Sequence, residues 1–316
     1  MDLANRALRR LKLSDLRLFH AVVQRGGMAK AAADLNLSQP AVSKAIAALE
    51  HTLGVRLLER HPQGVEPTVY GRALLKGGMA AFDELKQSVK QIEFLSDPAA
   101  GELRIGCSEP LASGFVAAVI ERLVRQYPRI VFHVVAADPV TLIEHELRQR
   151  SIDLVVAPTA RIASHPDLDI EVLFDDRQVV MAGAKNKWVR RRKIALADLV
   201  DGPWLLPPPD SIIGTSILEM FRAGGLKPPR GHVVSFSIPL CCQLLVGGRF
   251  LAMLPVSMAS VTRGVGLRIL DVEFAGIPRP TGIIALKRRT PTPLAQRFID
   301  EVREVAKPLA SRHLRA

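Results

Sequence analysis

The chain has 316 residues, more than one compact core usually organises, so two or three domains are expected. Its 48% hydrophobic content is ample for globular cores, and its net charge of +12 favours an anionic partner such as nucleic acid or a membrane surface. No window reaches about 18 consecutive apolar residues, and the N-terminal cations precede no apolar segment with a cleavage site. These absences argue against a membrane span and a secretory signal and predict a cytoplasmic protein.

The first predicted element is a helix over residues 13–23. Leu16, Phe19 and Val22 fall on one face of this helix. Ser14 is the expected N-cap, and the glycines at positions 26 and 27 end the pattern. We expect this helix to pack beneath the elements that follow it.

Residues 29–54 hold two helical patterns separated by a break too short for an ordinary loop. The first pattern is rich in alanine and stops at residues 36–38. Ser38 then supplies an N-cap, and Pro40 falls in the first turn of the second helix, where its missing N–H costs nothing. The apolar residues of the second helix share one face: Val42, Ile46, Leu49 and Leu53. The stretch is therefore predicted to be a helix-turn-helix.

The opposite face of the second helix carries no bulky obstruction. It offers Ser38, Gln39, Pro40, Ser43 and Lys44. Such a face fits the major groove of double-stranded DNA, with Gln39 and Ser43 expected at base edges. The alternative is an ordinary helical hairpin with a solvated polar face.

A short wing is predicted after the second helix. Residues 55–60 alternate as a strand, residues 61–66 turn, and residues 65–68 return. Arg56 and Arg60 would then reach phosphates beside the groove, which positions the domain without reading sequence. The alternative for both is surface charge beside Glu59.

A long helix is predicted from Thr68, its expected cap, to Leu95, because no proline intervenes. Its apolar residues follow the a and d positions of a heptad repeat: Leu75, Phe82, Leu85, Val89 and Ile92. The helix would be roughly 40 Å long, which suits a dimerisation linker better than a small domain. The glycines at positions 77 and 78 cost it about 1–2 kcal/mol of helix propensity.

Residues 96–101 break the helix, and strands then alternate with helices. We expect strands at 103–107, 130–136 and 154–157 and helices at 111–127 and 140–150, which is a βαβαβ arrangement. Further on we expect a strand pair within 170–182, a loop at 207–214, a helix at 215–223, strands at 232–236, 250–254 and 282–286, and a last helix at 294–306.

The string LSQPAVSKAIAALEHTLGVRLLER resembles the DNA-binding motif of LysR-type transcriptional regulators. GELRIGCSEPL, YPRI at residues 127–130 and IDLVV at residues 152–156 resemble the first lobe of that family's effector domain, which is similar to periplasmic binding proteins. The resemblance covers essentially the whole chain and is strongest before residue 95. Arg60 matches the family's Leu-x-x-Arg, whereas Tyr70 departs from its usual Ala-Gly. A slighter resemblance points to the galactose-binding-protein regulator subgroup.

The resemblance implies a multidomain protein. An all-α winged helix-turn-helix DNA-binding domain would cover residues 1–67, a dimerisation linker helix 68–97, and an α/β two-lobed, periplasmic-binding-protein-like effector domain 98–316. Lobe one would comprise residues 98–161 and 267–316, and lobe two residues 162–266. The implied function is a homodimeric or homotetrameric, sequence-specific transcriptional regulator. A small-molecule effector would switch its oligomer shape to control a metabolic or transport operon, and an activator would also contact RNA polymerase.

Small molecules bind beyond the carboxyl ends of strands in open α/β sheets, and between lobes in two-lobed folds. The candidate effector-binding residues in lobe one are Ser108, Glu109, Pro110, Leu111, Asp138 and Thr141. Those in lobe two are Pro207, Ser211, Gly214, Thr215, Ser235 and Phe236. The serines, Thr215 and Asp138 are also ordinary helix-capping residues, so each has a purely structural alternative. Acidic Glu109 and Asp138 disfavour an anionic ligand and favour a polyhydroxy ligand such as a sugar.

Neither a catalytic residue, a metal site nor a cofactor is expected. The three cysteines lack metal-site spacing, the histidines are scattered, and no P-loop, dinucleotide fingerprint or nucleophile elbow occurs. The basic run at residues 190–193 is interpreted as solvated surface. Two other functions stay open: an α/β enzyme carrying a DNA-binding domain, and an architectural DNA-binding protein without a ligand.

Overall fold

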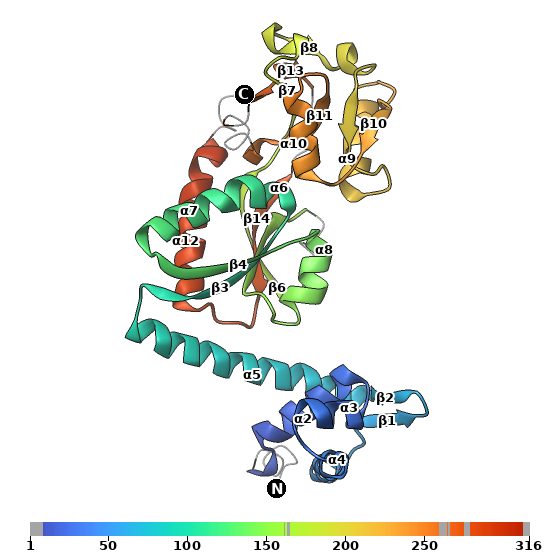
Figure 1. Ribbon diagram of the computed structural model, residues 1–316, viewed down its shortest axis with the longest axis vertical. Coiled ribbons are helices and arrows are strands. Elements are labelled where there is room, and N and C mark those ends of the chain that lie inside the picture. Colours follow the sequence, from blue (N-terminus) through green and yellow to red (C-terminus); the bar gives the residue numbers. More distant parts are fainter. Residues whose placement is uncertain are drawn as a thin grey trace. The chain divides into compact units, whose positions relative to one another are not determined.

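The computed structural model describes residues 9–160, 162, 165–258, 264, 266–274 and 279–311, without the side chains of residues 212 and 311 (Figure 1). It divides into two compact units, Met1–Val89 and Lys90–Ala316. The long helix α5 (Val69–Ser96) contains the boundary between them. Each unit has its own hydrophobic core, so each is described separately.

The N-terminal unit packs three short helices and a hairpin around one core. Its elements are α2 (Leu13–Arg25), α3 (Met28–Asp34), α4 (Gln39–Leu53), β1 (Leu58–His61), β2 (Gly64–Pro67) and the first part of α5. Val42 and Ile46 of α4 have no exposed surface and pack with Phe19 and Val22 of α2. The strands β1 and β2 pair antiparallel across a two-residue turn, which confirms the predicted hairpin.

The chain enters and leaves these helices mostly at the predicted residues. Gly26 and Gly54 adopt the left-handed conformation that ends a helix, with φ of 65° and 71°. Ser38 caps α4 by accepting a hydrogen bond from the Ala41 N–H at 3.4 Å. Ser14 is not the cap of α2, because the helix begins at Leu13 and the Asp15 carboxylate accepts from the N–H of residue 12 instead.

Helix α5 is continuous through both of its adjacent glycines. Thr68 caps it by accepting from the Gly71 N–H at 3.0 Å, while its hydroxyl donates to the Arg56 carbonyl at 2.8 Å. Gly71 is required here, because a Cβ would lie 2.2 Å from the Leu57 carbonyl oxygen. The start of α5 is therefore fastened directly to the chain that enters the wing.

The first lobe of the C-terminal unit is a five-stranded sheet with the order β4-β3-β5-β14-β6. The strands are β3 (Ala100–Cys107), β4 (Arg129–Ala136), β5 (Leu154–Pro158), β6 (Leu168–Asp175) and β14 (Pro280–Leu286). The helices are α6 (Glu109–Leu111), the π-helical η1 (Ala112–Val116), α7 (Ala117–Gln126), α8 (Pro139–Thr141), the π-helical η2 (Leu142–Leu147) and α12 (Pro293–Ser311). β3, β4 and β5 run parallel, as the βαβαβ pattern predicts.

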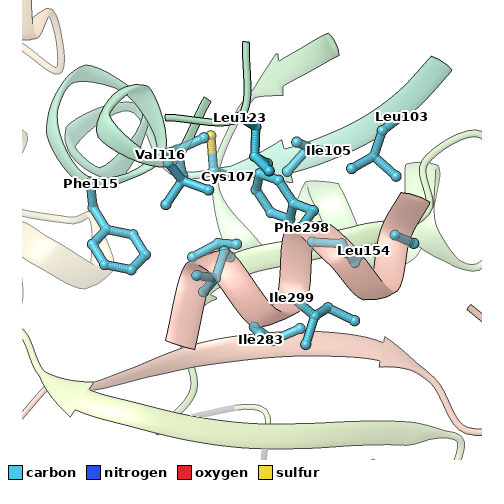
Figure 2. Close-up of a cluster of buried hydrophobic side chains, with 14 of the residues drawn as sticks. Leu103, Ile105, Cys107, Phe115, Val116, Leu123, Leu154, Ile283, Phe298 and Ile299 are labelled. Atoms are coloured by element: carbon cyan, nitrogen blue, oxygen red, sulfur yellow. The ribbon is translucent and has the colours of Figure 1, made fainter. Parts of the chain in front are cut away.

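Helix α12 closes one face of this sheet. Figure 2 shows Phe298 and Ile299 of α12 among Leu123 of α7 and Leu154 of β5, and all four belong to one buried cluster. Helix α12, near the end of the chain, and strand β3, the first strand of the unit, therefore contribute side chains to the same core.

The second lobe has its own five-stranded sheet, with the order β10-β9-β11-β7-β12. Its strands are β7 (Gln178–Gly183), β9 (Trp204–Leu206), β10 (Gly231–Val234), β11 (Leu251–Pro255) and β12 (Leu267–Ile269), and β8 (Ile194–Ala195) pairs with β13 (Val272–Glu273). The helices are α9 (Ile212–Ala223) and α10 (Ile238–Val246), with the 3-10 turns η3 (Lys187–Arg190), η4 (Leu196–Leu199) and η5 (Val256–Met258).

The strand pairings correct the expected lobe boundaries at residues 161/162 and 266/267. β6 does not pair with β7; it lies along β14 in the first sheet, from Leu168 to Asp175. β12 pairs with β7 in the second sheet. The chain therefore crosses between lobes after β6 and again before β14, later than predicted both times. The cause is a strand pairing between segments more than 100 residues apart, which no local pattern announces.

Candidate DNA-binding and effector sites

The outer face of α4 is open and carries a cation. Gln39, Pro40 and Lys44 are exposed, and Ser43 is half-buried. Ser38 lies at the N-terminus, where its hydroxyl oxygen is already engaged as the cap. Gln39, Pro40 and Lys44 are accessible to a groove. Ser38 is exposed as well, and its hydroxyl can still donate a hydrogen bond while it accepts the capping bond.

The wing supplies two further cations. Arg56 and Arg60 are exposed, and among the described residues neither forms an ion pair, so the alternative of neutralisation by Glu59 finds no support. Glu59 lies instead 3.8 Å from His61. The wing therefore presents its arginines unpaired.

Glu50 holds the wing against α4, a role that the sequence did not reveal. Its Oε1 accepts from the backbone N–H groups of Leu57 at 2.7 Å and Leu58 at 3.2 Å. Its position on the last turn of a helix, beside polar neighbours, looks like ordinary surface charge in sequence. A carboxylate that accepts two backbone N–H bonds fixes the strand that follows, because charge-assisted hydrogen bonds are the stronger ones.

The effector candidates of lobe one lie just beyond β3 and β4. Ser108 occupies the N-cap position of the helical segment 109–126, and its side chain makes no capping bond. Asp138 is a cap: its Oδ1 accepts from the N–H groups of Val140 and Thr141, both at 3.0 Å, and its Oδ2 accepts from the Thr141 hydroxyl. Burial raises the pKa of Asp138, but these hydrogen bonds outweigh burial and lower it, so the group is ionised at neutral pH.

The lobe-two candidates follow β9 and β10. Ser211 caps α9, accepting from the Gly214 N–H at 3.0 Å, and Thr215 donates to the Pro209 carbonyl at 3.1 Å. Ser235 accepts from the N–H of residue 237, and Phe236 is exposed. Asp138 and Ser211 therefore cap helices, as their structural alternatives predicted. Thr215 does not: α9 begins at Ile212, ahead of the expected start, so Thr215 lies within the helix. Ser108 holds the N-cap position, but its hydroxyl makes no capping bond.

The strand registers bring both sets of candidates to the junction of the lobes. In lobe one, β5 ends at Pro158 opposite Thr281, next to the crossing. In lobe two, β11 ends at Pro255 opposite Gln178, the first residue after the other crossing. Because β3 and β4 run parallel to β5, and β9 and β10 parallel to β11, all their carboxyl ends lie on the edges that border the junction.

A buried polar cluster lies at this junction and was not predicted from the sequence. Asp176 accepts from the Ser257 N–H at 2.9 Å and from its hydroxyl at 2.7 Å, and its own N–H donates to the Arg279 carbonyl at 3.0 Å. Burial raises the pKa of Asp176, and burial lowers the pKa of Arg279. Gln178 is also buried, and its side-chain amide has no hydrogen-bond partner among the described residues.

The lobes touch closely beside this cluster. α6 and η1 of lobe one contact η5 of lobe two. A Cβ added to Gly114 would lie 2.6 Å from the Ser257 carbonyl oxygen, so only glycine permits the approach. The two lobes are therefore packed closely together at this junction.

The second half of α5 exposes an apolar stripe at the predicted heptad positions. Leu85 is 47% exposed, Val89 54% and Ile92 64%, while Leu75 and Phe82 are half-buried. Apolar side chains at helical spacing with nothing covering them in the single chain suit a helix–helix partner.

Other chemistry finds little support among the described residues. No group of three His, Cys, Asp or Glu side chains there is arranged to hold a metal, and no described helix combines the length and apolarity needed to cross a bilayer. Burial raises the pKa of Cys107 and of Cys241 to about 12, so both thiols stay protonated at neutral pH and are poor nucleophiles.

A winged helix whose open face carries a cation, followed in the chain by a two-lobed α/β unit, is typical of a DNA-binding regulator with an effector domain. Comparisons with known proteins agree. Residues 13–72 match the model for the bacterial regulatory helix-turn-helix protein, lysR family, and residues 96–307 match the LysR substrate binding domain. The chain belongs to the LysR family of transcriptional regulators, which are not enzymes, so the α/β enzyme alternative is set aside.

Individual relatives agree with this assignment. The HTH-type transcriptional regulator GbpR of Azospirillum brasilense is 29% identical over 299 residues, covering 93% of this chain and 86% of that protein. A probable hydrogen peroxide-inducible genes activator of Mycobacterium leprae is 28% identical, covering 88% of each chain. A full-length OxyR variant from Pseudomonas aeruginosa shares the fold with a TM-score of 0.65 at 22% identity, covering 95% of this chain and 97% of that one.

Two substitutions on α4 should separate base reading from backbone binding. Gln39→Ala should relax base preference by about 1–3 kcal/mol at particular operator positions, because it removes an amide that can bind a base edge through two hydrogen bonds. Lys44→Ala should weaken binding to all DNA sequences alike. It should also reduce the slope of log affinity against log salt by about 0.9, the amount expected for one lost phosphate contact. Selection from randomised DNA followed by salt titration measures both effects; unchanged base preferences for Gln39→Ala would remove that residue from the recognition surface.

Proposed function

We propose that the protein is a homodimeric or homotetrameric regulator of a metabolic or transport operon, switched by a small molecule bound between its two lobes. The observation that carries this proposal is the arrangement of the junction. The carboxyl ends of the parallel strands of both sheets border one packed junction through which the chain crosses twice. A ligand touching both edges favours the closed arrangement in proportion to its difference in affinity for the two states.

We propose that seven residues of the N-terminal unit contact DNA: Ser38, Gln39, Pro40, Ser43, Lys44, Arg56 and Arg60. Acting on chromosomal DNA, the protein would work in the cytoplasm, and as an activator it would also meet RNA polymerase. These roles rest on the open face of α4 and the unpaired arginines of the wing.

The effector is proposed to be a neutral polyhydroxy compound such as a sugar. Ionised Asp138 and half-buried Glu109 at the rim of lobe one would repel an anion, whereas hydroxyl groups can donate to them. The buried amide of Gln178 at the junction end of β7 offers one more neutral donor and acceptor. The similarity to GbpR supports placing the chain in the galactose-binding-protein regulator subgroup.

The stripe on α5 is proposed to join two copies of the chain. Val89→Asp should abolish the dimer, because a charge in an apolar helix–helix contact is costly, yet should leave each chain folded, because Val89 is 54% exposed. Sedimentation should show monomers and DNA binding should lose its specificity. Gln91→Asp, an exposed position off the stripe, is the control; an unaltered oligomer in Val89→Asp contradicts the assignment.

The cleft is tested by a thermal-shift screen of neutral sugars and carboxylate metabolites. A ligand at about 100 times its Kd should add about 2.7 kcal/mol of stability. Ser108→Ala should keep the melting temperature of the free protein and lose most of the ligand-induced shift, since its hydroxyl makes no capping bond. Ser113→Ala serves as the control, because that hydroxyl donates to the Glu109 carbonyl on the same helical segment. Stabilisation by carboxylates alone would contradict the sugar proposal. An undiminished ligand-induced shift of the melting temperature in Ser108→Ala would show that Ser108 is not part of the effector site.

A further inference from the structure

A short segment of lobe two concentrates the positive charge of the C-terminal part of the chain. Residues 96–316 hold 29 Lys and Arg against 22 Asp and Glu, a net charge of +7. Six of these cations lie within nine residues, with no acidic residue between Arg177 and Asp198: Lys185, Lys187, Arg190, Arg191, Arg192 and Lys193. The remaining 212 residues of this part are therefore nearly neutral. We call residues 185–193 the basic segment.

All six cations are exposed, and none forms an ion pair within the described part of the chain. Arginines elsewhere in the unit behave differently: Arg148 pairs with Asp167, Arg289 with Asp153 and Arg303 with Glu171. Unpaired like charges placed side by side repel one another, so an isolated chain gains no stability from this arrangement. The segment is suited to an anionic partner.

The backbone of the basic segment is held in place. It includes the turn η3, whose N-cap is Asn186, accepting from the Trp188 N–H at 3.1 Å. Trp188 packs against the lobe-two core, with Lys187 and Arg191 over its ring at 5.3 and 5.0 Å from the centroid. The Lys193 N–H donates to Asp271 at 3.2 Å. The cations therefore project from a fixed loop, which lowers the entropy lost on binding.

The residues that line a neighbouring cavity bear on which kind of anion the basic segment could bind. A cavity of about 480 Å³ lies beside the segment and is lined by Lys187 and Arg249, but also by Asp198 and Asp201. A small anion in the cavity would face two carboxylates. On the outside of the segment the cations follow one another along the chain, and the carboxylate that contacts it there, Asp271, accepts from the backbone N–H of Lys193 at its end. An extended polyanion with repeating charges matches that surface better than a single bound phosphate does.

We propose that the basic segment is a second DNA contact, binding the phosphate backbone of duplex DNA already held by the winged helix. Contacts to phosphates carry no base information, so the segment adds affinity and leaves sequence preference unchanged. The inference adds to the proposed function and does not need the effector or the cleft.

The test is a salt titration of the full-length protein on its selected operator with long flanks. Arg190→Gln/Arg192→Gln/Lys193→Gln leaves the Trp188 contacts intact. Its slope of log affinity against log salt should fall by about 0.9 for each phosphate that is no longer bound, so by about 2.7 if all three side chains meet phosphates. Arg222→Gln/Lys227→Gln/Arg230→Gln removes three exposed cations from the same lobe and should keep the parent slope.

A charge-conserving variant, Arg190→Lys/Arg192→Lys, should retain the parent slope, and Arg190→Gln alone gives a smaller change if the triple variant does not fold. The proposal is overturned if the triple Gln variant keeps the parent slope. It is equally overturned if the control variant loses as much, since net charge alone would then explain the effect. Loss of transcription activation with unchanged DNA binding would assign the segment to an acidic protein partner and also overturn it.

Discussion

The buried carboxylate of Asp176 is the constraint on which the two-lobed unit depends. It sits at one chain crossing, receives two hydrogen bonds from Ser257 of η5, and its backbone meets Arg279 at the other crossing. Leaving a buried acceptor without its hydrogen bond costs about 1–3 kcal/mol, and more when the acceptor is charged. The cluster therefore ties both crossings and η5 together. The contact of Gly114 with Ser257 extends the tie to the helix that begins at the rim of lobe one.

In the N-terminal unit too, hydrogen bonds from single side chains join segments that are separate in the sequence. Glu50 binds the start of the wing to α4, and Thr68 binds the start of α5 to the residue that precedes the wing. The hydrogen bonds of two side chains thus fix how α4, the wing and the start of α5 are placed within this unit. A change in α5 would be passed to the wing through Thr68, because that hydroxyl both caps the helix and holds the Arg56 carbonyl. This gives the proposed dimer helix a direct connection to the DNA-binding surface.

Features that depend on a few neighbouring residues, such as helix ends, could be predicted from the sequence. Features that depend on contacts between distant segments, such as the lobe boundaries, could not. Ser38 and Pro40 start α4 and Gly54 ends it because capping and φ preferences act over a few residues, and the heptad stripe of α5 follows from spacing alone. The lobe boundaries were wrong because β6 and β14 pair across more than 100 residues. The partnership of Asp176 with Ser257 spans 81 residues and leaves no trace in either neighbourhood. Ser211 and Asp138 were recognised as possible caps from their residue types, but only the structure shows that both accept backbone N–H groups at a helix start.

The central claim is that a ligand between the lobes alters the oligomer that holds DNA. The most direct measurement is the length of the nuclease footprint on the operator, with and without an effector identified by thermal shift, as a function of effector concentration. We expect the footprint to change length at concentrations near the Kd for the free protein, and Ser108→Ala to shift this change to higher concentrations. A footprint of constant length at saturating effector would contradict the claim.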